Sequence, residues 1–144
     1  MIPDKPVFTD AGLRLPAELE RLPAFLAYVR RMAETAGLSP AQASRLELAV
    51  EEALVNVCGH AYVGQPQAGM VFCRVAIRSE GLTVSIVDEG LPFDPLAQPD
   101  PERGLDLDQR EPGGLGILLI KSLASEVTYR REGDRNVLMI EIRK

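Results

Sequence analysis

A carboxylate and a carboxamide, Glu52 and Asn56, lie four residues apart in a stretch whose apolar spacing predicts a helix. They are neighbours at the margin of its apolar face, where their oxygens suit a hard cation. Magnesium takes few protein ligands, so one Asn oxygen and a nearby Glu are sufficient. The alternative is an ordinary solvated helix margin, because this spacing is common by chance. The predicted core face of the helix consists of Leu46, Val50, Ala53, Leu54 and Val57.

An aspartate, Asp88, ends an apolar strand and shares a face with that strand's apolar side chains. A carboxylate on the core side must be hydrogen-bonded, because its desolvation is otherwise costly. The amino group of a ligand can supply the missing partner. Gly90, two residues later, permits a close approach to the backbone. The alternative is a plain turn rich in Asp, Gly and Pro.

Three glycines, Gly113, Gly114 and Gly116, lie at the start of an apolar helix predicted over residues 115–123. Such glycines expose backbone N–H groups at the positive end of a helix, where an anion such as phosphate binds. The alternative is a flexible hinge in a surface loop. The chain lacks the P-loop pattern Gly-x4-Gly-Lys-Ser/Thr and the catalytic motifs of eukaryotic kinases, so those folds are poor candidates.

The histidine and the cysteines carry a weaker signal. The only histidine, His60, lies one turn beyond Asn56 and could face the site, but a lone histidine is more often a packed structural residue, and we favour that role. Cys58 and Cys73 are far apart and have no second Cys or His at metal-ligand spacing. We therefore expect both cysteines to be reduced, packed thiols.

The elements that position these groups follow from hydrophobic periodicity. A 3.6-residue spacing predicts a first helix over residues 17–36, ended by Gly37. Ser39 and Gln42 are expected to form a capping box at the start of a second helix, which runs to about His60. Alternating apolar residues predict two hairpins, 71–78 with 82–88 and 126–131 with 136–142.

The order of the elements indicates the fold class. A strand, two helices, a hairpin, a long loop, a helix and a second hairpin predict an α+β two-layer sandwich with a mixed, mainly antiparallel sheet. The long loop covers about residues 95–112, and its only cations are Arg103 and Arg110. Either arginine could meet a terminal phosphate, but a solvated loop charge is the interpretation we prefer.

Length and composition exclude several classes of protein. The 144 residues suit one domain, residues 1–144, and no apolar run approaches the roughly 18 residues that cross a bilayer. The N-terminus lacks the basic start and apolar stretch of a secretory signal, so we expect a cytoplasmic location. A net charge of −5 without a dense Lys/Arg run argues against direct contact with nucleic acid.

Taken together, the three motifs resemble one superfamily in order and spacing. ELAVEEALVNVCGHAY is similar to its N box, DEGLPFDP to its G1 box, and GGLGILLIKSLASEVTY to its G2 box. The superfamily, GHKL, includes histidine kinases and DNA gyrase and has the Bergerat ATP-binding fold, in which three helices cover one face of the sheet. Within it, the chain most resembles the anti-sigma-factor serine/threonine kinases of the RsbW and SpoIIAB type, over nearly its whole length.

The resemblance implies a role for each motif residue. Glu52 resembles the general base that activates a substrate hydroxyl or water, and Asn56 the ligand of Mg²⁺. Asp88 resembles the residue that binds the adenine amino group of ATP, and Gly90 the glycine that lets adenine approach. The glycines at the G2 box would cradle the phosphates. Asn136, where many members have Thr, is the candidate for a water-mediated contact to adenine; the implied nucleotide-binding glycines after the lid loop are Gly113, Gly114 and Gly116.

The resemblance also implies partners and a function. It predicts an ATP-dependent kinase that phosphorylates a Ser or Thr of an anti-anti-sigma protein of the STAS type and sequesters a sigma factor, as a possible homodimer. The rival hypothesis is a regulatory module that binds nucleotide, or keeps only the fold, and sequesters its partner without phosphoryl transfer. An ATPase piece of a histidine kinase is a weaker alternative, because the only histidine lies inside the N box.

Overall fold

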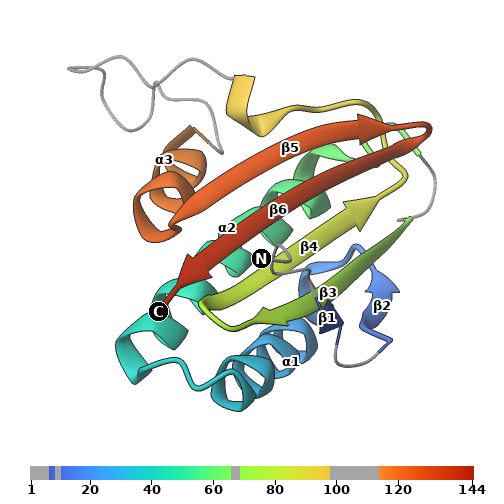
Figure 1. Cartoon of the computed structure of the whole chain (residues 1–144). Helices are drawn as coiled ribbons and strands as arrows, with labels where there is room; N and C mark the ends of the chain where they lie inside the picture. Colours follow the sequence, from blue (N-terminus) through green and yellow to red (C-terminus); the bar gives the residue numbers. More distant parts are fainter. Residues whose placement is uncertain (1–6, 9–10, 66–68, 98–113) are drawn as a thin grey trace.

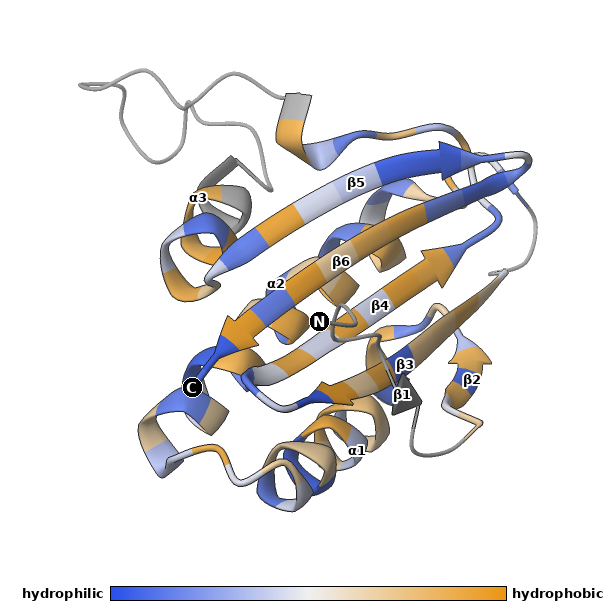
Figure 2. Ribbon diagram, viewed as in Figure 1, coloured by the Kyte–Doolittle hydropathy of each residue, from blue (hydrophilic) through white to orange (hydrophobic). Residues whose placement is uncertain are grey.

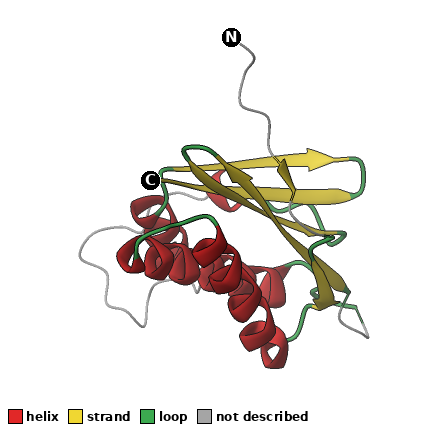
Figure 3. Ribbon diagram, turned by 60° about the horizontal axis from the view of Figure 1, so that its bottom comes forward, coloured by secondary structure: helices red, strands yellow, loops and turns green. Residues whose placement is uncertain are grey.

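The computed structural model describes residues 7–8, 11–65, 69–97 and 114–144 (Figure 1). In this part of the chain, six strands form one sheet, and three α-helices accompany it together with two short 3-10 helices. The helices lie on one side of the sheet, so the molecule has two layers (Figure 3). The predicted α+β two-layer sandwich is confirmed, with the helices on a single face.

The sheet is antiparallel at every pairing between the described strands. Its order is β1-β3-β4-β6-β5, and β2 pairs with β3 as well. The sheet was predicted to be mixed and mainly antiparallel; among the described strands it is antiparallel throughout. The two predicted hairpins are present as β3–β4 and β6–β5. The strands are β1 Val7–Phe8, β2 Leu13–Pro16, β3 Met70–Arg78, β4 Gly81–Asp88, β5 Glu126–Glu132 and β6 Arg135–Arg143.

The second helix begins at a local capping motif. The predicted capping box is present, since Gln42 N donates to Ser39 Oγ at 3.2 Å and Ser39 N donates to Gln42 Oε1 at 2.9 Å. The first helix starts later than predicted, because a 3-10 turn, η1 Leu19–Arg21, precedes it. None of the helices in the described residues is long and apolar enough to cross a membrane. The α-helices are α1 Leu22–Thr35, α2 Pro40–His60 and α3 Gly114–Leu123, and η2 is Pro95–Ala97.

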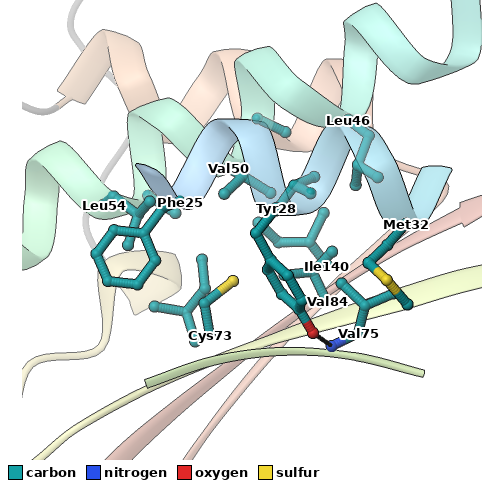
Figure 4. Close-up of a cluster of buried hydrophobic side chains, with 14 of the residues drawn as sticks. Phe25, Tyr28, Met32, Leu46, Val50, Leu54, Cys73, Val75, Val84 and Ile140 are labelled. Atoms are coloured by element: carbon teal, nitrogen blue, oxygen red, sulfur yellow. Dashed lines mark hydrogen bonds between the residues drawn. The ribbon is translucent and has the colours of Figure 1, made fainter. Parts of the chain in front are cut away.

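The hydrophobic core lies between the helices and the inner face of the sheet. β4 and the middle of β6 are mainly apolar, while the turn between β5 and β6 is hydrophilic (Figure 2). Of the predicted helix stripe, only Val57 remains partly exposed. Cys58 and Cys73 are free thiols, packed as expected, and burial raises the pKa of Cys58. The central side chains include Phe25, Tyr28, Leu46, Val50, Leu54, Val75, Val84 and Ile140 (Figure 4).

The outer edge of β3 carries two short strands with a gap between them. β2 pairs with residues 70–73 and β1 with residues 76–77, so neither strand reaches Val75. The backbone N–H of Val75 donates instead to the phenol oxygen of buried Tyr28, at 3.2 Å (Figure 4). This bond satisfies a buried backbone donor and joins α1 to the sheet.

We expect Tyr28→Phe to lower the free energy of unfolding by about 1–2 kcal/mol, because it leaves the buried N–H of Val75 without an acceptor while keeping the aromatic ring. Urea denaturation followed by circular dichroism measures this change. Tyr129→Phe offers a comparison, since that phenol bonds a side chain rather than a strand backbone. A change below about 0.5 kcal/mol for Tyr28→Phe would contradict the role assigned to this bond.

Candidate functional site

A pocket lies between α2, the inner face of β4, β5 and β6, and the segment that follows β4. It has about 400 Å³ of space between its atoms, a volume that includes open solvent at its mouth. Three residues singled out from the sequence, Asn56, Asp88 and Asn136, lie together in its lining. The remaining lining is mostly apolar and suits a flat, uncharged ring: Ala53, Val57, Ala61, Ile86, Phe93, Pro95, Tyr129 and Leu138.

Asp88 is a buried carboxylate at the end of β4, with only 5% of its surface exposed. Its Oδ1 accepts two hydrogen bonds, from Gly90 N and from Asn136 Nδ2, both at 2.9 Å. Among the described residues, both hydrogen bonds to this carboxylate fall on Oδ1. A carboxylate accepts at two oxygens, so Oδ2 retains capacity for a donor on a ligand.

Asn136 lies directly opposite Asp88, because the two residues are partners in the β4–β6 register. The residue is buried, with 5% of its surface exposed, and both the oxygen and the nitrogen of its side-chain amide form hydrogen bonds. Nδ2 donates to Asp88 Oδ1 at 2.9 Å and to Leu91 O at 2.8 Å. Oδ1 accepts from the Tyr129 hydroxyl at 2.6 Å, from Arg131 Nη1 at 3.2 Å and from Phe93 N at 3.3 Å.

Two residues of this network, Tyr129 and Arg131, were missed from the sequence. Both lie on the face of β5 that shares a side with Asn136, and Arg131 Nη1 also donates to Gly90 O at 2.8 Å. Their alternate spacing on a predicted strand put them on one face. Only the β5–β6 register, in which Arg131 pairs with Asn136, shows that this face reaches the site.

Gly90 packs against the end of α2. A Cβ atom at this position would lie 2.1 Å from Ala61 O and 2.7 Å from Ala61 Cβ, and Leu91 N donates to the same carbonyl at 2.9 Å. Gly90 is not among the residues that line the pocket. The close approach that a glycine permits here is therefore made by the protein's own backbone, and direct contact of Gly90 with adenine stays a prediction.

Gly90→Ala is expected to destabilise the fold by about 1–3 kcal/mol, because the added methyl group must displace the backbone at Ala61. The segment from Asp88 to Phe93 then shifts, so ligand affinity at the pocket should fall as well. Thermal unfolding gives the first effect. The matched control is Gly59→Ala, because no atom lies within 4 Å of the added methyl there; equal destabilisation by both substitutions would contradict the packing argument.

The backbone after β4 is held from the other side by Tyr62. Its hydroxyl donates to Met70 O at 2.5 Å and accepts from Glu89 N at 3.0 Å. Burial raises the pKa of Tyr62, and the hydrogen bond from Glu89 N opposes that shift. The phenol therefore stays protonated and keeps donating across the neutral range, which fixes the first residue of the segment.

Glu52 and His60 lie on α2, four residues before and four residues after Asn56. Glu52 is half-buried one turn before Asn56 and is not one of the residues lining the pocket. His60 stacks on Phe93, with ring centroids 5.0 Å apart and an interplanar angle of 18°. The structural role favoured for His60 matches this packing, and through Phe93 it supports one wall of the pocket.

The glycine-rich segment is described only in part. The predicted helix is present and begins one residue earlier than expected: Gly114 is the first residue of α3, and Gly116 lies in its first turn. Gly113 and the long loop of about residues 95–112, apart from Pro95–Ala97, lie outside the described residues, as do Arg103 and Arg110. The phosphate contacts of Gly113, Gly114 and Gly116 therefore remain predictions.

Comparison with known proteins matches this architecture to one family. The model of the histidine kinase-like ATPase domain family matches residues 15–142, so the chain belongs to that family. A solved structure of the RsbU and RsbW domains of a Mycobacterium tuberculosis protein superposes with a TM-score of 0.60 at 15% identity, covering 93% of this chain and 32% of that one. This likeness shows the fold.

Curated relatives are similar in sequence over most of their length. The serine-protein kinase RsbW of Staphylococcus epidermidis is 30% identical over 133 residues, covering 90% of this chain and 84% of the relative. RsbW of Listeria monocytogenes is 32% identical over 126 residues, covering 84% and 80%. The serine/threonine-protein kinase BtrW of Bordetella bronchiseptica is 31% identical over 96 residues, covering 66% of each.

Proposed function

We propose that this protein is an ATP-dependent serine/threonine kinase that phosphorylates an anti-anti-sigma partner of the STAS type and sequesters a sigma factor in the cytoplasm. The observation that carries the nucleotide part is buried Asp88, with its Oδ2 left for a ligand donor in an apolar pocket. The similarity to serine-protein kinases of the RsbW type supports the partner-switching part.

The pocket residues fit an adenine base. Ile86 and Leu138 supply apolar contact from the sheet, and Val57 supplies it from α2. Adenine presents an amino donor at its edge, which matches the acceptor capacity of Asp88. A charged acceptor in a desolvated pocket contributes more than one in water, so this contact can decide which base binds.

The residues present also fit a magnesium ion held mainly by the nucleotide. Asn56 lies in the pocket lining with Glu52 one turn away, and no group of three His, Cys, Asp or Glu side chains in the described residues forms a metal site of its own. Magnesium keeps several waters and binds substrate phosphates, so one or two protein oxygens suit it. When bound, it would neutralise charge on the phosphates. Asn56 would hold it.

Glu52 is proposed to act on the nucleophile. Its carboxylate would accept the proton of the substrate Ser or Thr hydroxyl while that oxygen forms its bond to the γ-phosphorus and ADP leaves. Positioning and charge neutralisation supply most catalysis of phosphoryl transfer, so a single base with a correctly bound nucleotide is sufficient. The start of α3, with Gly114 and Gly116, would orient the phosphates through backbone N–H groups.

Incubation with Mg²⁺ and γ-labelled ATP in the presence of a STAS-type antagonist tests this proposal. We expect label on a Ser or Thr of the antagonist, and none on a version in which that residue is Ala. ATP binding without transfer to any candidate antagonist would favour the rival, a nucleotide-binding module that acts by sequestration alone. Glu52 lies outside the pocket lining, and this observation favours the rival hypothesis.

A further inference from the structure

Asn136 joins four parts of the site through one side-chain amide. It lies on β6, bonds Asp88 on β4 and Tyr129 on β5, and reaches the segment after β4 at Leu91 O and Phe93 N. These bonds use both amide hydrogens and the carbonyl oxygen. A ligand therefore gains no contact with this amide unless it breaks a bond within the protein.

The neighbours of Asn136 fix which end of the amide faces Asp88. Phe93 N and Arg131 Nη1 can only donate, and both point at Oδ1, at 3.3 and 3.2 Å. Leu91 O can only accept, and it lies 2.8 Å from Nδ2. A flipped amide would place donor against donor and acceptor against acceptor, so the orientation with Nδ2 toward Asp88 is the one that satisfies every group.

This orientation of the Asn136 amide determines which oxygen of Asp88 is available to a ligand. Oδ1 is held by two donors, Asn136 Nδ2 and Gly90 N, which fix the plane of the carboxylate. The acceptor capacity that remains is on Oδ2. A base edge with an amino group satisfies it, whereas a base edge with a carbonyl or no donor there leaves a buried carboxylate oxygen unpaired.

We propose that Asn136 is a positioning residue for base selection. It holds the Asp88 carboxylate so that Oδ2 is left to accept a hydrogen bond from an amino group on the purine. This inference rests on the proposed nucleotide function. It assigns Asn136 an indirect role, in place of the contact to adenine that the resemblance implied. Tyr129 and Arg131 orient the amide and act one step further from the ligand.

Two nucleotides separate positioning from a general structural effect. ATP carries the amino group, and purine riboside triphosphate lacks it but keeps the ring, ribose and phosphates. Calorimetry on the full chain with Mg²⁺ should give wild-type protein at least about tenfold tighter binding of ATP, the size expected for one hydrogen bond to a charged group. In Asn136→Ala the ratio should fall below about threefold, mainly through weaker ATP binding.

Further variants keep the test decisive. Asn136→Asp retains the acceptor for Tyr129, Arg131 and Phe93, loses the donors to Asp88 Oδ1 and Leu91 O, and sets a second carboxylate against Asp88. It should therefore also lose the preference for ATP, even if Asn136→Ala fails to fold. Asp94→Asn, which removes a charge outside the pocket lining, should keep the preference.

Unchanged discrimination in a folded Asn136→Asp variant, or equal weakening of both nucleotides, would overturn the inference alone. Wild-type protein that binds neither nucleotide would overturn the proposed function, and this inference with it.

Discussion

Asp88→Asn is expected to raise the Kd for ATP by at least about 100-fold while leaving the fold intact. The two donors at Oδ1, Gly90 N and Asn136 Nδ2, require an oxygen there, so the new amide turns its oxygen toward them. Its NH2 group then replaces Oδ2 and faces the amino group of adenine, donor against donor. Calorimetric titration with ATP and Mg²⁺ measures the loss.

The matched control for this substitution is Asp94→Asn. Asp94 is partly buried and its Oδ1 accepts a hydrogen bond from Leu96 N at 2.9 Å, but it is not one of the pocket-lining residues. Its replacement should change the Kd for ATP by less than about threefold. If the two variants bind ATP equally well, Asp88 is not the group that recognises the base.

The second large effect is expected for Glu52→Gln, which should lower the rate of phosphoryl transfer by about 10²–10⁴-fold, the usual contribution of a general base. ATP affinity should stay within about threefold of wild type, because Glu52 does not line the pocket and Gln keeps the shape of the side chain. Single-turnover transfer to the antagonist gives the rate, and calorimetry gives the affinity.

Glu51→Gln controls for the loss of charge on α2. Glu51 is the adjacent residue, is half-buried like Glu52 and points about 100° away around the helix. It should transfer phosphate at close to the wild-type rate. Full activity of Glu52→Gln would remove the proposed base, and parallel loss in both variants would indicate an effect of helix charge.

The sequence carried enough information to place two polar residues of the pocket. Asp88 could be placed because the alternation of β4 put it on the core face, and Asn56 because the helical period put it beside the core stripe. The two sequence periods predict these positions correctly because the strand and the helix each bury one face in the folded protein. The capping box at Ser39 is equally local and was predicted correctly.

Features that depend on register and close packing could not be predicted. The bond between Asp88 and Asn136 requires the β4–β6 register, and that register is set by the burial of whole strand faces. The same holds for Tyr129 and Arg131. The reason for glycine at Gly90 is the approach of Ala61, the residue that follows α2 and lies 29 positions earlier in the chain.

The N-terminal region shows the same limit. A 3-10 turn at Leu19–Arg21 delays α1 to Leu22, because the apolar spacing that predicts a helix does not mark where its hydrogen bonds begin. The strand predicted before the two helices is present as two short strands, β1 and β2, whose bounds are set by their pairing with β3 rather than by a periodic pattern.

Titration of the isotopically labelled 144-residue chain with ATP and Mg²⁺, followed through its backbone amide resonances, tests the central claim most directly. Saturable shifts should appear at Asn56, Asp88, Gly90 and Asn136, together with the start of α3, and the same titration of Asp88→Asn should leave those resonances unmoved. The absence of shifts at millimolar ATP, or saturable shifts confined to residues outside the pocket, would contradict the assignment of this pocket as the nucleotide site.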